Sequence, residues 1–188
     1  MLNKFRKIFD PFFNKLGLLA AKTGLPPFFW SSFGLIMAFL SCLSYSSIFF
    51  KDGLYGGIFL LISGFADILD GSVARAKGLV SSRGAFLDST FDRLGELLIF
   101  TGILIGGFSD PFLILMALSF SLLVSYARAR GESLMIKLSG IGIGERAERI
   151  LVLSIASILG HINYGVIIVL VLAFITFLQR VILIVTKL

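Results

Sequence analysis

The sequence predicts an all-α, polytopic membrane protein with six transmembrane helices preceded by an N-terminal interfacial amphipathic helix. Of its 188 residues, 57% are hydrophobic and the mean hydropathy is +0.98, whereas soluble domains are about 45–50% apolar. The apolar residues fall in long runs, most of them close to the roughly 20 residues that cross a bilayer as a helix. No polar linker divides the chain, so residues 1–188 are expected to form a single domain.

Residues 1–23 combine basic and apolar side chains at helical spacing. This pattern predicts a juxtamembrane helix that lies in the membrane interface, with Pro11 bending or breaking it. A solvated basic tail is the alternative, and the aromatic residues of the segment argue against it. The pattern consists of Lys4, Arg6, Lys7 and Lys15 on the basic side and Phe5, Ile8, Phe12, Phe13 and Leu16 on the apolar side.

Six apolar segments follow Pro26 and Pro27 and form the predicted bundle over residues 28–186. The fifth segment is short in hydropathy alone, and it spans a membrane only if its charged beginning lies at the interface. The lone Cys42 falls inside an apolar segment, where a buried thiol is expected. The segments are Phe28–Phe50, Leu54–Ala74, Ala85–Gly107, Pro111–Tyr126, Ile150–Gly160 extended back to Arg146, and Tyr164–Thr186.

The basic residues indicate how the bundle is oriented. Of the 17 lysines and arginines, all but Lys51 fall in the N-terminal segment, in the second and fourth connections with their flanks, or near the C-terminus. Because cytoplasmic connections are enriched in Lys and Arg, both termini and the charged connections are expected on the cytoplasmic side of the cell membrane. The net charge of +6 favours membrane lipid or a phosphorylated substrate as a partner, and no stacking platform suggests nucleic acid.

Four aspartates flank the second connection of the predicted bundle. Asp67 and Asp70 are three residues apart, and Asp88 and Asp92 are four apart. Both spacings place a pair on one helix face, and the short connection makes the two helices antiparallel neighbours, so the pairs can converge. Carboxylates repel one another and are costly in a membrane. Hard divalent cations prefer oxygen ligands and would offset both costs, which predicts a metal site for phosphoryl-group chemistry.

Small residues and one arginine accompany the aspartates. Gly71 directly follows the first pair, Ala74 lies one turn further, and Gly84 lies one turn before the second pair. Small side chains beside a metal site leave room for a bulky ligand or let helices approach closely. Arg75 can form a charge-assisted contact with a phosphate.

The stretch from Asp67 to Asp92 matches the pattern D-x2-D-G-x2-A-R-x8-G-x3-D-x3-D at every specified position, and the chain resembles the CDP-alcohol phosphotransferase family. The resemblance implies a membrane enzyme, typically a homodimer, that moves a phosphate-linked alcohol from a CDP-linked donor to a hydroxyl acceptor and releases CMP. It implies that Asp92 is the catalytic base. It also implies two divalent cations, Mg²⁺ or Mn²⁺, on Asp67, Asp70, Asp88 and Asp92, and CDP contacts from Gly71, Ala74, Arg75 and Gly84.

Three arginines are expected to address the acceptor. Arg128 ends the fourth apolar segment, Arg149 opens the fifth, and Arg180 lies within the last, where a cation needs an anionic partner. Their surroundings resemble the branch of the family that makes phosphatidylinositol phosphate or archaetidylinositol phosphate. That resemblance implies that the three arginines bind the phosphate of inositol phosphate, the expected acceptor of a CDP-linked lipid.

Two positions depart from the pattern of the family. Arg128 stands where that branch usually has Lys, which keeps the charge and changes the geometry. Phe28 follows Pro27 where Asn or Asp is usual, and Ser31 is the nearby polar residue that could take over.

Alternatives stay open within and beyond the family. A related transferase could use glycerol phosphate as acceptor, or CDP-inositol as donor. A cation transporter with a carboxylate site is a remote alternative. It predicts acids near the middle of the membrane and two similar halves of the chain, whereas the aspartates here are expected at one face, next to Arg75, and the two halves differ.

Overall fold

The computed structural model describes residues 17–46, 53–138 and 140–188, and these residues form helices joined by short connections. Residues 17–22 are helical and precede the main bundle. The bundle consists of α2 (Pro27–Tyr45), α3 (Gly53–Ala76), α4 (Ser82–Ile105), α5 (Pro111–Ser133), α6 (Arg146–Ile158) and α7 (Ile162–Lys187).

Local sequence signals begin these helices. Pro27 and Pro111 stand in the first turns of α2 and α5, where a missing N–H costs nothing. The Asp110 carboxylate caps α5 by accepting hydrogen bonds from the backbone N–H groups of Phe112 (2.9 Å) and Leu113 (3.3 Å). Ser81 caps α4 in the same way, because its hydroxyl accepts from the Gly84 N–H at 3.1 Å. These prolines and caps therefore define the first residues of α2, α4 and α5.

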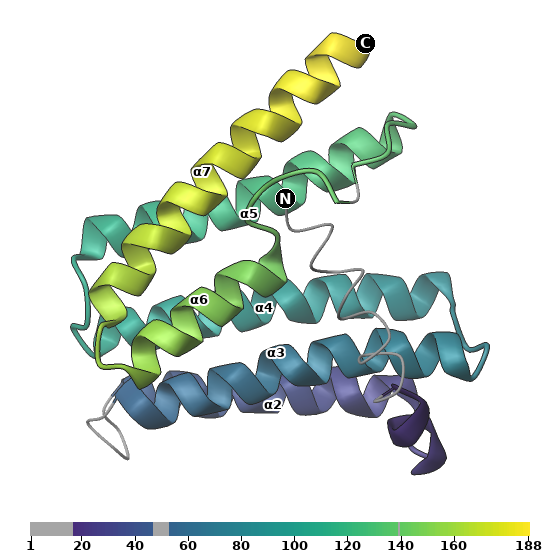
Figure 1. Ribbon diagram of the computed structural model, residues 1–188, viewed down its shortest axis with the longest axis horizontal. Helices are drawn as coiled ribbons and strands as arrows, with labels where there is room; N and C mark the ends of the chain where they lie inside the picture. Colours follow the sequence, from purple (N-terminus) through teal and green to yellow (C-terminus); the bar gives the residue numbers. More distant parts are fainter. Residues whose placement is uncertain (1–16, 47–52, 139) are drawn as a thin grey trace.

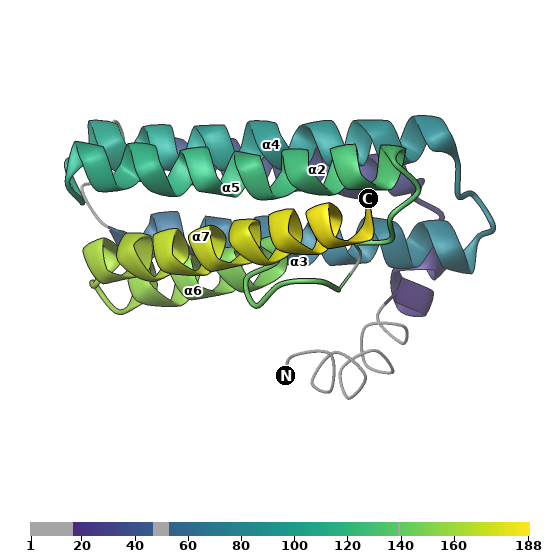
Figure 2. The same ribbon diagram turned by 90° about the horizontal axis from the view of Figure 1, so that it is seen from above.

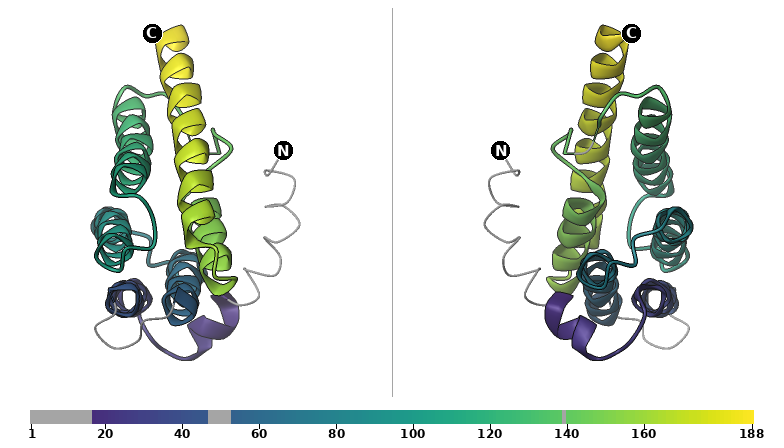
Figure 3. Two further views of the ribbon diagram at one scale, coloured as in Figure 1. Left: turned by 90° about the vertical axis from the view of Figure 1, so that its left-hand side faces the viewer. Right: turned by 90° about the vertical axis from the view of Figure 1, so that its right-hand side faces the viewer.

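The helices form two layers (Figure 1). One layer contains α2, α4 and α5, and the other contains α3, α6 and α7, as Figures 2 and 3 show from two further directions. Close packing joins the helices in a ring, through α2–α3, α3–α6, α6–α7, α7–α5, α5–α4 and α4–α2. The helices α3 and α4 therefore belong to opposite layers and face each other across the bundle, although they are consecutive in the chain.

The core fills the half of the bundle remote from the aspartates. Leu60, Ile103 and Val166 are fully buried there, each from a different helix. Tyr45 is also fully buried, and its hydroxyl donates a 2.7 Å hydrogen bond to Ser157 Oγ, which joins α2 to α6. Burial of such side chains contributes roughly 1.5–3 kcal/mol each in water, and packing contacts replace that term where the outside is lipid.

Four helices of the described chain, α2, α3, α5 and α7, are long and apolar enough to cross a membrane. Large apolar side chains such as Phe39, Leu115 and Ile182 are exposed on their outer faces. This pattern fits an integral membrane protein. The full count of six spans stays a prediction, because α4 carries several charges in its first half and α6 has 13 residues, about 20 Å at 1.5 Å per residue.

The helix limits differ modestly from those expected from hydropathy. The helix α5 continues to Ser133, seven residues beyond the expected end at Tyr126, because charged residues that form helices well follow the apolar stretch. The first expected segment ran to Phe50, whereas α2 ends at Tyr45 and residues 47–50 lie outside the described chain. The expected amphipathic helix of residues 1–23 falls mostly on residues 1–16, which also lie outside it. Cys42 is buried, as expected.

Candidate active site

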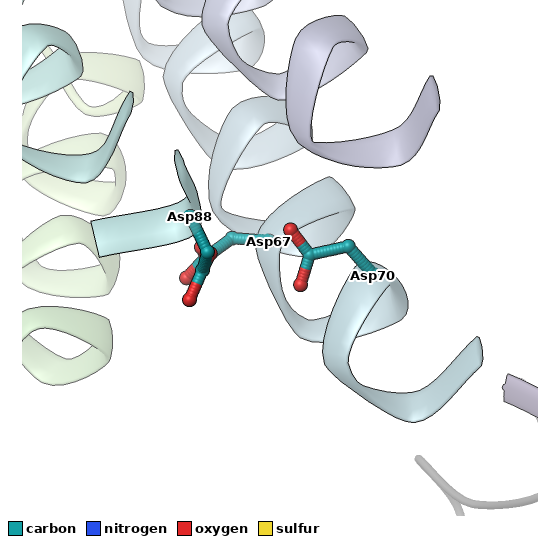
Figure 4. A group of neighbouring side chains, drawn as sticks. All are labelled: Asp67, Asp70 and Asp88. Atoms are coloured by element: carbon teal, nitrogen blue, oxygen red, sulfur yellow. The ribbon is translucent and has the colours of Figure 1, made fainter. Parts of the chain in front are cut away.

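Three of the four aspartates meet at one end of the bundle (Figure 4). Asp67 and Asp70 project from the last turns of α3, and Asp88 projects from the second turn of α4. Each residue has a carboxylate oxygen within 4.8 Å of those of the other two. The expected spacing on each helix face is what lets the two layers bring these groups together. Direct packing of α3 against α4 was expected. In the structure α2 packs against both helices instead, and the side chains of α3 and α4 meet across the interior.

Asp70 is the most buried of the aspartates, with 6% of its surface exposed. Its Oδ2 atom accepts a 2.6 Å hydrogen bond from Ser31 Oγ of α2. A buried carboxylate needs such donors, because removal from water penalises its charge. Ser31 therefore supplies the polar contact in the first turns of α2. Phe28 cannot do so, because its side chain is apolar and the residue is 55% exposed.

The fourth aspartate, Asp92, is engaged with an arginine from the other layer. Nη1 of Arg146, the first residue of α6, lies 2.8 Å from Asp92 Oδ1 and 2.7 Å from Asp67 Oδ2. This contact was not predicted from the sequence, in which other basic residues lie beside the aspartates along the chain. The charged beginning of α6 was a signal, but its partner depends on how α6 packs against α3.

A small cleft opens beside these groups. Small side chains of α2 and α3 line it, together with the aspartates, Phe91 and Arg146; the small residues are Ser31, Gly34, Ala38 and Ser63. The donor set is all carboxylate and hydroxyl oxygen, which suits Mg²⁺, Mn²⁺ or Ca²⁺ better than softer metals. The three adjacent carboxylates receive the Ser31 hydroxyl and the Arg146 guanidinium, which is shared with Asp92, so they still carry excess negative charge. The residues present therefore fit a divalent cation.

Comparisons with known proteins agree with this geometry. A sequence model of the family described as CDP-alcohol phosphatidyltransferase matches residues 25–187. The chain belongs to that family. It is accordingly a transferase of the CDP-alcohol type, and the aspartate pattern that predicted this lies within the matched region.

Two similar proteins from archaea are both named archaetidylinositol phosphate synthase. Archaetidylinositol phosphate synthase from Pyrococcus horikoshii is 38% identical over 96% of this chain and 95% of its own. Archaetidylinositol phosphate synthase from Methanothermobacter thermautotrophicus is 37% identical over 97% of this chain and 93% of its own.

Crystal structures of phosphatidylinositol phosphate synthase from Mycobacterium tuberculosis share the fold. The structure with bound CDP-DAG has a TM-score of 0.76 and 23% identity, covering 92% of both chains. The structure with manganese and citrate has a TM-score of 0.77 and 24% identity, covering 93% of this chain and 89% of the other.

The residues expected to contact CDP lie at the same end of the transferase as the aspartates. Gly71, Ala74 and Arg75 belong to the last turns of α3, and Gly84 belongs to the first turn of α4. Arg75 is exposed, and its Nη2 donates to Ser72 Oγ at 3.1 Å. A Cβ on Gly71 would lie 3.3 Å from Arg75 Nη1, which is tight, so the glycine leaves the guanidinium room. These four residues are available to a ligand that reaches the aspartates from this end.

The three arginines expected to bind the acceptor differ in their surroundings. Arg149 is 2% exposed, with Nη2 lying 2.6 Å from Glu96 Oε1 and Nη1 donating to the Gly144 carbonyl at 2.8 Å. Glu96 was missed by the sequence analysis, although it stands four residues after Asp92 and continues the same helix face. Arg128 is half exposed and pairs with Glu132 at 2.9 Å.

Arg180 is also 2% exposed and holds the connection between α5 and α6. Its Nε and Nη1 atoms donate to the carbonyls of Ile141 (3.0 Å) and Val124 (2.9 Å), and Nη2 lies 3.5 Å from Glu145 Oε1. Arg128 and Arg149 each lie close enough to Arg180 to repel its charge. The structure thus groups the three arginines and supplies two of them with buried protein partners.

Proposed function

We propose that the transferase moves a phosphatidyl-type group, diacyl or archaeal diether, from a CDP-linked lipid to inositol 1-phosphate and releases CMP. The observation that carries the proposal is the meeting of Asp67, Asp70 and Asp88 within 4.8 Å, with Asp92 beside them. Relatives named archaetidylinositol phosphate synthase support the lipid donor and the acceptor. The choice between diacyl and diether chains does not alter the chemistry at the phosphates.

The four aspartates would hold two divalent cations, Mg²⁺ or Mn²⁺, in this proposal. The family is divalent-cation dependent, and the mycobacterial structure contains manganese. Such cations neutralise the diphosphate of the donor and the charge that develops on the departing CMP. The role of Asp67, Asp70 and Asp88 is to place that positive charge at the cleft.

Asp92 would be the base. The acceptor hydroxyl attacks the lipid-linked phosphorus, the bond from that phosphorus to the CMP oxygen breaks, and the hydroxyl proton passes to a carboxylate oxygen of Asp92. Asp92 lines the cleft together with the other aspartates, so a hydroxyl bound there lies within its reach. Gly71, Ala74, Arg75 and Gly84 would position the CDP moiety at the open end.

Arg128, Arg149 and Arg180 would bind the phosphate of the acceptor. Arg128 is the member whose guanidinium is half exposed and can turn to a ligand without breaking a buried contact. Arg180 has its longest contact, 3.5 Å, to Glu145, so its Nη2 atom can exchange that partner for a phosphate. Arg149 is paired with Glu96, and it would bind the phosphate only by sharing its guanidinium between Glu96 and the ligand.

The transferase would lie in the cell membrane with this site on the cytoplasmic side. The α3–α4 and α5–α6 connections and the C-terminus lie toward one end of the bundle in Figure 1, and most of the described basic residues lie in these segments or in the helix turns that flank them. A homodimer is also part of the proposal and rests on the family resemblance. Cross-linking in membranes, followed by electrophoresis, tests the dimer.

Measurement of CMP release tests the proposed reaction. Purified wild-type protein with Mn²⁺ or Mg²⁺ and a CDP-linked lipid should release CMP when inositol 1-phosphate is present. The rate should be much lower with glycerol phosphate, with free inositol or without an acceptor. CDP-inositol in place of the CDP-linked lipid tests the alternative donor. Absence of CMP release with every donor and acceptor would refute the proposed function, and a preference for glycerol phosphate would refute the acceptor assignment.

A further inference from the structure

Arg146 reaches from the first residue of α6 into the carboxylate site. One nitrogen, Nη1, contacts Asp67 of α3 at 2.7 Å and Asp92 of α4 at 2.8 Å, so a single cationic group bridges carboxylates of two helices. A divalent cation shared by Asp67 and Asp92 would draw on the same two carboxylates, and its positive charge would repel the guanidinium. The guanidinium and a shared cation therefore compete for these carboxylates.

The contacts of Arg146 leave it displaceable. Its Nε atom is buried and has no hydrogen-bond partner among the described residues, which is an unfavourable arrangement for a charged donor. Its side chain is 17% exposed at the cleft, so it can move outward. Gly95 of α4 offers no side chain against it, and a Cβ there would lie 3.6 Å from Nη2. Arg146 thus holds the carboxylates without being enclosed by them.

The four aspartates are not equivalent with respect to Arg146. Asp67, Asp70 and Asp88 form the compact group within 4.8 Å, and Asp92 stands outside this group and is held by the arginine. A first cation can bind the compact group through oxygens that Arg146 leaves free, such as those of Asp70 and Asp88. A second cation that uses Asp92 competes there with the guanidinium.

We propose that Arg146 competes with the second of the two cations for Asp67 and Asp92, so that the transferase binds its cations in two unequal steps. This proposal rests on the proposed two-cation function. Arg146 acts here as a positioning residue that neutralises clustered acids and links α6 to α3 and α4 until the second cation takes its place. Metal binding is thereby coupled to the position of the α6 N-terminus.

Titration with Mn²⁺ tests the competition without any substrate. Free Mn²⁺ is measured by electron paramagnetic resonance against wild-type protein and the variants Arg146→Gln and Arg83→Gln. Wild type should show a tighter and a weaker class of site. Arg146→Gln should tighten the weaker class about tenfold, equivalent to about 1.4 kcal/mol. The control Arg83→Gln removes an exposed charge near the start of α4. It should change the Mn²⁺ affinity of the weaker class by less than roughly twofold, because solvent screens that charge.

Thermal unfolding supplies a second readout. In EDTA, Arg146→Gln should melt below wild type because the acids lose their counter-charge, and Mn²⁺ should raise its melting temperature by more than it raises that of wild type. If Arg146→Gln does not fold, Arg146→Lys carries the test, since the shorter lysine side chain should hold the two carboxylates less closely and should also tighten the weaker class.

An unchanged or weakened second class in the folded variant would overturn the competition. That outcome is distinct from failure of the proposed function. Release of CMP by wild type together with unchanged Mn²⁺ affinity in Arg146→Gln would refute only the competition. Two unequal Mn²⁺ classes that respond to Arg146→Gln, with no CMP release, would refute only the reaction.

Discussion

Arg146 and Arg149 stand three residues apart on α6, and their surroundings differ sharply. The Arg149 side chain is 3% exposed and pairs one-to-one with Glu96, whereas the Arg146 side chain is 17% exposed and is shared between Asp67 and Asp92. The first arrangement is enclosed, and Arg149 Nη1 donates to the Gly144 carbonyl, although Arg149 Nε and Glu96 Oε2 have no hydrogen-bond partner among the described residues. The second is open to the cleft.

Two arginines one helix turn apart therefore have different roles: Arg149 stabilises the fold, and Arg146 belongs to the candidate active site. A buried ion pair with matched charges joins α4 to α6 and stays in place, because either partner alone would be a buried unpaired charge. A cluster with more carboxylates than arginines cannot be satisfied within the protein and is suited to bind cations. Glu96 and Asp92, which are four residues apart on α4, show the same division.

Asp92→Asn should produce the largest change in activity. Loss of the proposed base should lower kcat by roughly 10²–10⁴-fold, because an amide cannot accept the hydroxyl proton. Binding of a CDP-linked nucleotide should be retained within a few-fold, measured by calorimetry with Mn²⁺ present. A variant that keeps most of the wild-type kcat would show that Asp92 is not the base.

Arg149→Met should produce the largest loss of stability. The substitution leaves Glu96 buried without a partner and should lower the free energy of unfolding by about 3–5 kcal/mol. Thermal unfolding in detergent measures this, and the double variant Arg149→Met with Glu96→Leu should recover most of the loss. An unchanged melting temperature in the single variant would contradict the structural role of the closed pair.

Arg180→Ala should act on the acceptor more than on the donor. The KM for inositol phosphate should rise about tenfold, the effect of losing a charge-assisted contact worth about 1.5 kcal/mol, with a smaller rise for the CDP-linked lipid. The neighbouring exposed residue supplies the control, Gln179→Ala, which should leave both values near wild type. Equal increases for donor and acceptor would indicate that Arg180 only supports the α5–α6 connection.

Ser31→Ala should have the smallest effect. It removes the 2.6 Å hydrogen bond to Asp70 and should weaken Mn²⁺ binding by roughly five- to tenfold, which corresponds to about 1–1.4 kcal/mol. The same change at Ser89, whose hydroxyl donates to the Phe86 carbonyl, is the matched control and should not alter Mn²⁺ affinity. Equal Mn²⁺ affinity in Ser31→Ala and wild type would show that α2 does not support the cluster.

The sequence was sufficient for the parts of the site set by local periodicity. The spacing of Asp67, Asp70 and Asp88 on two helices separated by a short connection predicts that they meet, and the helix starts at Pro27 and Pro111 follow from proline itself. Each of these inferences depends on neighbours within one turn or one connection.

The partners of the arginines needed the tertiary structure. The contact of Arg146 with Asp67 spans 79 residues and depends on α6 packing beside α3, which no periodicity encodes. The buried Arg180 was predicted to need an anionic partner, whereas two backbone carbonyls accept most of the hydrogen bonds that its guanidinium donates. Only Glu96 could have been found earlier, as the third acid in the series that includes Asp88 and Asp92.

The position of bound manganese tests the central claim most directly. Anomalous diffraction from crystals of the full chain grown with Mn²⁺ should show two peaks between α3 and α4. One should be coordinated by the compact group of Asp67, Asp70 and Asp88, and the other by Asp92, with Arg146 moved from its present contacts. Peaks elsewhere in the molecule, or no peak among these four carboxylates at saturating Mn²⁺, would contradict the account.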